Sequence, residues 1–193
     1  MCSPARVVVI ITLGGRAGAG KTTVGGELAR RLGYKFYSAG DVRRKYAIEQ
    51  GLTIAELNKR GETDPTSDKL VDDYLRTIGL TENDIVADAR LGFFFIPHSI
   101  KVFFVAEDIV RAKRTFEKAR PEERPESLED ALRLLDQREE SDAIRYHNLY
   151  GVHPFDTRRF DILIDTSRRT VDQTTEIIYN YIQSPVPNRK KLY

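Results

Sequence analysis

A glycine-rich loop between an apolar run and a predicted helix constrains this chain more than any other feature. Residues 15–22 fit the pattern G-x-x-x-x-G-K-[ST] and follow the apolar residues 7–11. Glycines let consecutive backbone N–H groups converge on an anion that side chains would keep at a distance. The N-terminus of the following helix adds partial positive charge, and Lys21 adds a full charge near the β- and γ-phosphates of a bound nucleotide. A glycine-rich turn without a ligand is the alternative, but it leaves the complete pattern between a strand and a helix unexplained.

The loop therefore predicts a P-loop that binds a nucleoside triphosphate, which we take to be ATP. The Thr22 hydroxyl is placed to ligate Mg²⁺. We assign the binding of ATP to Gly15, Arg16, Ala17, Gly18, Ala19, Gly20, Lys21, Thr22 and Thr23.

Composition limits what else the chain can be. Its length of 193 residues suits one domain with a buried core. Its 31 basic and 29 acidic residues nearly balance, which argues against a general nucleic-acid binder, because such a protein would show a face of one sign. A single cysteine, Cys2, excludes an internal disulfide framework and fits a reducing cytoplasmic location. The apolar run at residues 7–13 is too short to span a membrane, and we interpret it as a core strand.

Hydrophobic patterns predict alternating strands and helices. Strands are predicted at residues 6–13, 34–38, 83–88, 99–105 and 161–165. Helices are predicted at residues 21–32, 41–50, 53–59, 107–119, 128–150 and 171–182, and a further helix passes through Leu70 and Leu75 after a turn at Asp64-Pro65. This order predicts an α/β fold with a five-stranded parallel sheet and helices on both faces. Ligands of such sheets bind at the carboxyl ends of the strands.

Two further polar segments follow predicted strands and should lie at that edge. Ser38, Gly40 and Arg44 follow the second strand, and Arg44 is suited to a bidentate grip on a second phosphate. Arg43 and Arg44 could instead be solvated helix residues. Asp88 and Arg90 follow the third strand, where Asp88 would hold Mg²⁺ through water. A helix-capping Asp88 is the alternative.

A third group of charged residues lies on the predicted helix at residues 128–150. Arg138, Asp142 and Arg145 share one helical face by their spacing. They and the pair Arg111 and Arg114 flank the charged segment 115–127, where a mobile lid would sit. An ordinary surface pair of Arg138 with Asp142 is the alternative.

Six segments in this order resemble the cytidylate kinases, in particular the short archaeal type of the nucleoside monophosphate (NMP) kinases. They are GRAGAGKTT, YSAGDVRR, DARLG, VRAKR, REESDAIRYHNLYGV and IDTS, and they extend over residues 8–182. The first is shared across a superfamily, whereas YSAGDVRR and REESDAIRY are much more discriminating. The resemblance implies the three-layer P-loop NTPase fold in one kinase domain at residues 1–193. Its parts would be a core at 5–40, 80–115 and 158–183, an NMP-binding segment at 41–79, a lid near 115–127 and a flexible tail at 184–193.

The resemblance also implies roles for single residues. Lys21 and Thr22 would bind the ATP phosphates and Mg²⁺, and the segment around Thr166 would border the adenine. Arg114 and Arg145 would act on the transferring phosphoryl group. The implied catalytic residues are Lys21, Arg114, Arg138 and Arg145. The implied acceptor-binding residues are Ser38, Gly40, Arg44, Arg90, Arg138 and Asp142.

Two features depart from the bacterial members of the family. Leu91 stands where those members carry an acidic residue that helps to read cytosine. The run Phe93-Phe94-Phe95-Ile96 is unusually apolar, and we interpret it as core, with packing under the base as the alternative.

The expected reaction transfers the γ-phosphoryl group of MgATP to CMP or dCMP. The expected enzyme is a monomer with no membrane or nucleic-acid partner. A kinase of the same fold for UMP, dTMP, AMP or a metabolite is the nearest alternative. A P-loop ATPase that acts as a switch or assembly factor is a second, and an RNA-associated protein that uses the basic residues 189–191 is a third.

Overall fold

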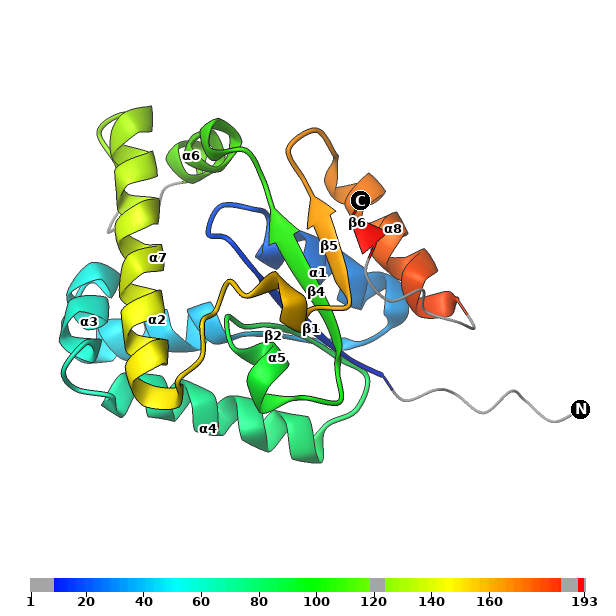
Figure 1. The fold of residues 1–193 in the computed structure, drawn as a ribbon, viewed down its shortest axis with the longest axis horizontal. Coiled ribbons are helices and arrows are strands. Elements are labelled where there is room, and N and C mark those ends of the chain that lie inside the picture. Colours follow the sequence, from blue (N-terminus) through cyan, green and yellow to red (C-terminus); the bar gives the residue numbers. More distant parts are fainter. Residues whose placement is uncertain (1–8, 119–123, 185–190, 193) are drawn as a thin grey trace, which may run out of the picture.

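The computed structural model describes residues 9–118, 124–184 and 191–192, and a fully parallel sheet lies at its centre (Figure 1). The strands stand in the order β2-β3-β1-β4-β5-β6. Their bounds are β1 Ile10–Gly15, β2 Lys35–Ser38, β3 Ile85–Asp88, β4 Ile100–Val105, β5 Ile162–Asp165 and β6 Lys191–Leu192. The five predicted strands are confirmed, and the two-residue strand β6 is an addition that pairs with β5. The tail was expected to be flexible, which stays a prediction: Lys191 and Leu192 form β6, while residues 185–190 and 193 lie outside the described residues.

Eight α-helices surround the sheet in the described part of the chain. Their bounds are α1 Lys21–Leu32, α2 Ala39–Glu49, α3 Ile54–Gly61, α4 Thr66–Thr81, α5 Gly92–Phe95, α6 Asp108–Glu117, α7 Leu128–Tyr150 and α8 Val171–Gln183. The predicted bounds of α1 and α7 are those observed. The Thr53 side chain caps α3 and Glu56 completes the capping box, as sequence spacing indicates. The short helix α5 and a 3₁₀ turn at Thr157–Arg159 are absent from the prediction.

The helices cover both faces of the sheet and give it three layers (Figure 1). Successive side chains of β1 point to opposite faces, as strand geometry requires. Ile11 and Leu13 pack with residues of α1 and α8 on one face. Ile10 packs with residues of α4 on the other. The three-layer α/β fold predicted from the sequence is therefore confirmed.

The apolar run Phe93-Phe94-Phe95-Ile96 belongs only in part to the core. Phe93 and Ile96 are 5% and 0% exposed, whereas Phe94 is 39% exposed. The Phe93 ring packs against Phe160, with ring centroids 4.9 Å apart. The interpretation as core therefore holds for Phe93 and Ile96.

Gly15 lets the P-loop leave the sheet beside β4. Its φ of +124° is rare for any residue with a side chain, and a Cβ atom there would lie 2.2 Å from the carbonyl oxygen of Phe104. The next residue, Arg16, donates its backbone N–H to that same oxygen at 3.0 Å. The loop therefore starts from a position fixed by the neighbouring strand.

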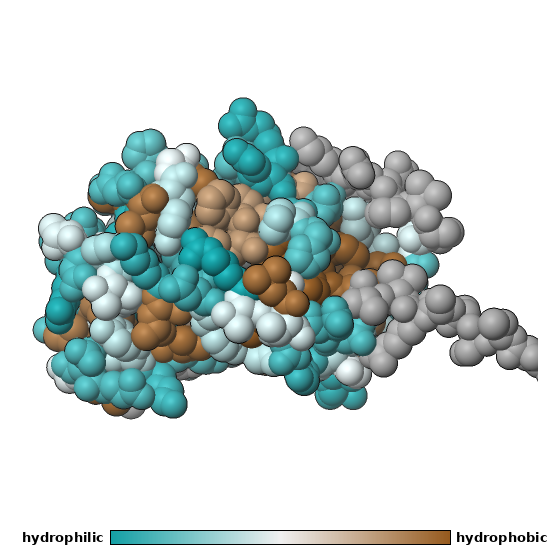
Figure 2. All heavy atoms as spheres, turned by 90° about the horizontal axis from the view of Figure 1, so that it is seen from below, coloured by the Kyte–Doolittle hydropathy of each residue, from teal (hydrophilic) through white to brown (hydrophobic). Residues whose placement is uncertain are grey.

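Apolar side chains on the surface occur in small groups between hydrophilic residues on the face seen in Figure 2. In the described part of the chain, no helix is long and apolar enough to cross a membrane.

Candidate active site

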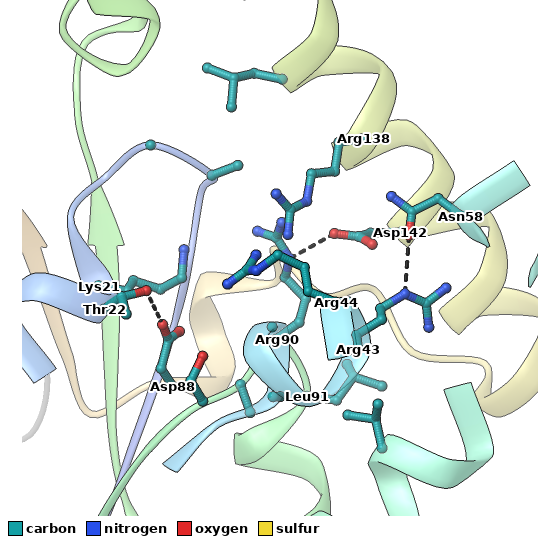
Figure 3. A pocket seen from close by; sticks show the side chains of 18 of the residues that line it. Lys21, Thr22, Arg43, Arg44, Asn58, Asp88, Arg90, Leu91, Arg138 and Asp142 are labelled. Carbon is teal, nitrogen blue, oxygen red and sulfur yellow. Dashed lines mark hydrogen bonds and ion pairs between the residues drawn. The ribbon is translucent and has the colours of Figure 1, made fainter. Parts of the chain in front are cut away.

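A cavity of about 420 Å³ opens where β1, β2 and β3 end (Figure 3). The strand register places its first residues side by side, because Asp88 aligns with Leu13 on one side and with Ser38 on the other. The P-loop, the start of α2 and the segment after β3 therefore meet at one edge. The convergence predicted from the alternation of strands and helices is observed.

Lys21 and Thr22 begin α1 at the floor of this cavity. Gly20 precedes them in a left-handed conformation with φ of +89°, which turns the chain into the helix. The Lys21 ammonium donates to the carbonyl oxygens of Gly15 and Arg16, at 3.2 and 2.8 Å. Burial, with the nearby charge of Arg90, lowers the pKa of Lys21 to about 7.

Thr22 and Asp88 offer the oxygen atoms expected at a magnesium site. The Thr22 hydroxyl donates to Asp88 Oδ2 at 2.5 Å, so the two oxygen atoms lie side by side next to the P-loop. The described residues hold no group of three or more histidine, cysteine or acidic side chains that could bind a metal by themselves. Mg²⁺ commonly takes one or two protein oxygens and completes its shell with water and phosphate. The residues present fit that ion.

Three guanidinium groups converge opposite Lys21 (Figure 3). They belong to Arg44 of α2, Arg90 after β3 and Arg138 of α7. Arg44 pairs with Asp41 at 2.6 Å, and its Nε atom is buried without a hydrogen-bond partner. Gly40 lies beside this side chain, and a Cβ there would be in ordinary van der Waals contact with Arg44 Nη2, at 3.4 Å. In all, seven cationic and four acidic side chains line the cavity: Lys21, Arg43, Arg44, Arg90, Arg114, Lys118, Arg138, Asp68, Asp72, Asp88 and Asp142.

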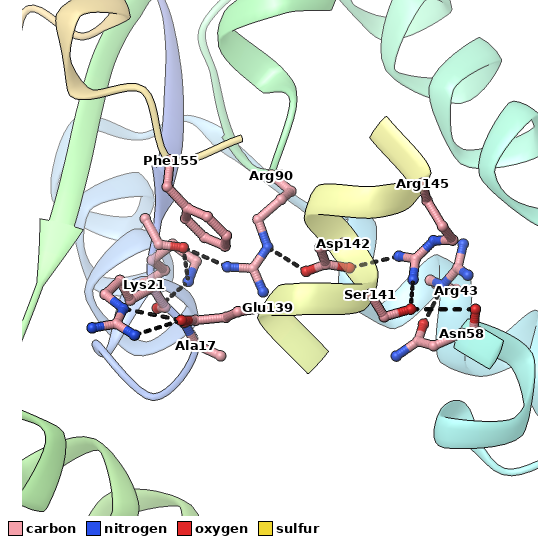
Figure 4. Close-up of polar contacts among 12 residues, drawn as sticks. Ala17, Lys21, Arg43, Asn58, Arg90, Glu139, Ser141, Asp142, Arg145 and Phe155 are labelled. Carbon is pink, nitrogen blue, oxygen red and sulfur yellow. Dashed lines mark hydrogen bonds and ion pairs between the residues drawn. The ribbon is translucent and has the colours of Figure 1, made fainter. Parts of the chain in front are cut away.

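Arg90 joins the P-loop to α7. Its Nη1 donates to the Gly15 carbonyl oxygen at 2.6 Å, and its Nε pairs with Asp142 Oδ2 at 2.8 Å (Figure 4). The Phe155 ring lies against the guanidinium, 5.2 Å from centroid to Cζ. Burial opposes the charge on Asp142, but Arg90 and Arg145 outweigh it and lower the pKa of that carboxyl. Asp142 is therefore a charged group that positions Arg90.

The structure does not bring Arg145 to the cavity. Its side chain is fully buried behind Asp142, and each guanidinium nitrogen has a partner (Figure 4). Nε donates to Asp68 at 3.0 Å, Nη1 to Ser141 at 2.7 Å and Nη2 to Asp142 at 2.5 Å. This position differs from the predicted contact with the transferring phosphoryl group, because spacing on a helix sets the face but not the depth of a side chain.

Several cavity residues were missed at the sequence level. Arg43 is 8% exposed and pairs with Asp68 at 2.7 Å, so it is no solvated helix residue. Its Nε donates to Asn58 Oδ1 at 3.1 Å. Asp68 and Asp72 both line the cavity from α4. Their spacing of four residues was the available signal, since it places them on the helical face that carries the apolar residues.

Asp72 is a buried carboxyl with a tyrosine partner. It is 3% exposed and accepts a hydrogen bond from the Tyr150 hydroxyl at 2.5 Å. Burial raises the pKa of Asp72 to about 6, against the effect of that hydrogen bond.

Glu139 of α7 binds the P-loop at Arg16 and Ala17, a contact that the sequence analysis also missed. Its Oε1 accepts from the Ala17 backbone N–H at 2.8 Å and from Arg111 Nη2 at 2.6 Å. Its Oε2 accepts from Arg16 Nη2 at 2.8 Å. Arg111 in turn donates from Nε to the Ala17 carbonyl oxygen at 2.8 Å. The P-loop is thus tied to α6 and α7 as well as to the sheet.

The P-loop presents only part of its length to the cavity. Ala17, Gly18, Gly20, Lys21, Thr22 and Thr23 line it. The cavity lining does not include Gly15, Arg16 or Ala19. Gly15 lies against β4, and the Arg16 side chain points to Glu139.

Arg114 and Thr166 meet at the far end of the P-loop. Arg114 lines the cavity and donates from Nη1 and Nη2 to the hydroxyl and carbonyl oxygens of Thr166, at 2.9 and 2.7 Å. The Thr166 hydroxyl lies 2.9 Å from the Ala19 carbonyl oxygen. Thr166 is 3% exposed and lies outside the cavity lining, and its hydroxyl supports the P-loop at Ala19. That the segment around Thr166 borders the adenine stays a prediction.

Comparison with known proteins identifies the family. The model of the cytidylate kinase-like family matches residues 10–168. The chain belongs to the cytidylate kinase-like family. It is 33% identical over 182 residues to the cytidylate kinase of Natronomonas pharaonis, an alignment that covers 93% of this chain and 92% of the relative. The family and the geometry indicate an ATP-dependent phosphotransferase of the NMP kinase type, as predicted.

A second relative carries a different name. The S-adenosylmethionine-dependent nucleotide dehydratase of Lacinutrix mariniflava is 32% identical over 174 residues, which cover 90% of this chain but 36% of that protein. Among solved structures, shikimate kinase from Bacteroides thetaiotaomicron matches with a TM-score of 0.64 at 18% identity, over 92% of this chain and 100% of the other. That likeness shows that the two chains share a fold.

Proposed function

We propose that this protein transfers the γ-phosphoryl group of ATP to the 5′-phosphate of CMP, and also of dCMP. The observation that carries the proposal is the convergence of Arg44, Arg90 and Arg138 opposite Lys21 in one cavity. A P-loop alone accounts for one phosphate-bearing molecule. Guanidinium groups from three other segments are suited to a second one. Membership of the cytidylate kinase-like family supports CMP as the acceptor.

The reaction needs alignment and charge neutralisation more than proton transfer. An oxygen of the CMP phosphate attacks the γ-phosphorus of ATP, and the bond from that phosphorus to the β–γ bridging oxygen breaks to release ADP. The acceptor oxygen is already anionic, so no general base is required. Lys21 and the P-loop N–H groups hold the γ-phosphate, while Arg44 holds the attacking phosphate. Arg114 and Arg138 lie where charge spreads during transfer.

Mg²⁺ bound near Thr22 and Asp88 would neutralise charge on the β- and γ-phosphates. Asp88 would hold the ion with its carboxylate through water, and Thr22 would contribute its hydroxyl. Asp142 holds Arg90 in place and lies beside Arg138, where the acceptor ribose would fit.

A panel of acceptors tests the proposal. ADP release is measured with ATP, Mg²⁺ and CMP, dCMP, UMP, dTMP or AMP. We expect kcat/KM for CMP and dCMP to exceed that for the other acceptors by about 100-fold or more. Arg44→Ala should raise the KM for CMP about 10- to 100-fold, because a charge-assisted contact to phosphate is lost. The exposed neighbour Lys45→Ala is the matched control and should leave the KM unchanged.

Other outcomes separate the alternatives. A preference for UMP, dTMP or AMP would make the chain a kinase for a different acceptor. ATP turnover that is independent of acceptor and of Arg44 would favour a P-loop ATPase switch and contradict the proposal.

A further inference from the structure

The cavity has a second end that the phosphate chemistry leaves unexplained. Beyond the arginines it is lined by Asn58 of α3, by one face of α4 and by Leu91. That face carries Asp68, Val71, Asp72 and Leu75, whose spacing puts them in one row on the helix. Val71, Leu75 and Leu91 are 8%, 2% and 2% exposed. Apolar residues that line the cavity together with Asn58 and two carboxylates suit a flat aromatic ring with a hydrogen-bonding edge.

The orientation of Asn58 is fixed from behind. A guanidinium nitrogen only donates hydrogen bonds, so the Asn58 side-chain atom that Arg43 Nε contacts at 3.1 Å must be the amide oxygen. The amide nitrogen then points to the cavity side, toward Asp142 (Figure 3). In the described part of the chain this nitrogen has no hydrogen-bond partner. Asn58 therefore presents a donor.

The two carboxylates of α4 differ in what they offer. Both oxygens of Asp68 accept from arginines, Oδ1 from Arg43 and Oδ2 from Arg145. Asp72 uses one oxygen, Oδ2, to accept from the Tyr150 hydroxyl. Its Oδ1 has no partner among the described residues. Asp68 is thus a structural anion, and Asp72 presents an acceptor.

We propose that Asn58 and Asp72 read the edge of the acceptor base and select a base that carries an exocyclic amino group beside a ring acceptor. Cytosine shows this pattern, with an amino group next to N3 and then O2. Uracil and thymine show a carbonyl oxygen at the position of the amino group, and that oxygen would face the Asp72 carboxylate. The inference rests on the proposed function, because it assigns this end of the cavity to the base of the monophosphate. It also explains how this chain can select cytosine although Leu91 stands where the bacterial members carry an acidic residue that helps to read that base.

The decisive variant is Asp72→Asn, which keeps the shape of the side chain and adds a donor. The measured quantity is the ratio of kcat/KM for CMP to that for UMP. We expect the variant to lower this ratio about 10- to 100-fold, because an unmatched buried polar pair costs about that factor. Asn58→Ala should lower kcat/KM for CMP by about tenfold through loss of the donor.

Two controls separate reading of the base from support of the fold. Asp73→Asn changes the adjacent carboxylate, which is exposed and pairs with Arg76, and it should leave the ratio unchanged. Tyr150→Phe removes the hydroxyl behind Asp72 and should lower the melting temperature without inverting the preference. A folded Asp72→Asn protein that retains the ratio of the unmodified enzyme overturns the inference and leaves the CMP kinase proposal standing. An unmodified enzyme that does not prefer CMP to UMP contradicts the proposed function itself.

Discussion

The two walls of the cavity are held in place in different ways. The donor wall, residues 15–23, is fixed mainly through its backbone, with Arg16 N–H bonded to Phe104 and Ala17 N–H bonded to Glu139. The acceptor wall comprises Arg90 and the cavity-lining residues of α2, α3, α4 and α7. It is fixed through buried side-chain ion pairs, in which Asp68 accepts from both Arg43 and Arg145.

This difference matches what each wall has to recognise. A triphosphate presents the same oxygens in every ATP-dependent enzyme, so backbone N–H groups can bind it. An acceptor differs from one enzyme to another, so side chains must select it. Changes in the donor wall should therefore affect all acceptors equally, and changes in the acceptor wall should depend on the acceptor.

The largest effect is expected for Lys21→Ala in the donor wall. Loss of its charge near the γ-phosphate should lower kcat about 10³-fold, which corresponds to about 4 kcal/mol. The loss should be similar with CMP and dCMP, as measured by ADP release at saturating substrate. The exposed Lys113→Ala on α6 is the control and should retain full activity. A loss of activity with only one of the two acceptors would contradict the expectation that changes in the donor wall affect all acceptors equally.

Arg145→Ala comes next and should act mainly on stability. Removing one member of a buried ion network costs about 3–5 kcal/mol. We expect about 3 kcal/mol, since Arg90 still pairs with Asp142 and Arg43 with Asp68. Urea unfolding followed by circular dichroism measures this loss. If stability is unchanged and kcat falls about 10³-fold, Arg145 would act on the phosphoryl group, as the family resemblance implied.

Glu139→Gln should have a smaller effect that is confined to the donor wall. The neutral amide cannot satisfy Arg16, Arg111 and the Ala17 N–H together, so the P-loop should be held less firmly. We expect the KM for ATP to rise about tenfold and the KM for CMP to change less than twofold. The exposed neighbour Glu140→Gln provides the matched control. Equal shifts for both substrates would show that α7 transmits the change to both walls.

The smallest effect concerns protons taken up by the donor wall. The pKa of Lys21 is lowered from 10.5 to about 7, so at pH 8 the free enzyme holds this side chain largely neutral. Bound phosphates favour the ammonium form, so binding of ATP at pH 8 should take up close to one proton per site, and much less at pH 6. Calorimetry in buffers with different ionisation enthalpies measures this number. Lys21→Arg should abolish the uptake, and uptake that persists in that variant would assign it to another group.

The donor wall could be predicted from sequence because its signal is local. Glycines, Lys21 and Thr22 act through a backbone turn that the motif itself determines. The acceptor wall was predicted only in part, since Arg44, Arg90 and Arg138 follow recognisable segments. Asn58 and Asp72 were missed because their role depends on packing between α2, α3, α4 and α7. The same packing places Arg145 behind Asp142, which helical spacing alone cannot reveal.

Helix α7 carries contacts to both walls within two turns, through Glu139 on one side and Asp142 and Arg145 on the other. With 23 residues it is about 34 Å long. Glu139 lies at its midpoint, so a tilt of about 5° around that point would leave the Glu139 contact in place and move Arg145, about 9 Å along the axis, by about 0.8 Å. A misplacement of about 1 Å can cost about 10²-fold in rate. The angular precision of this one helix therefore sets how accurately the two substrates can be aligned.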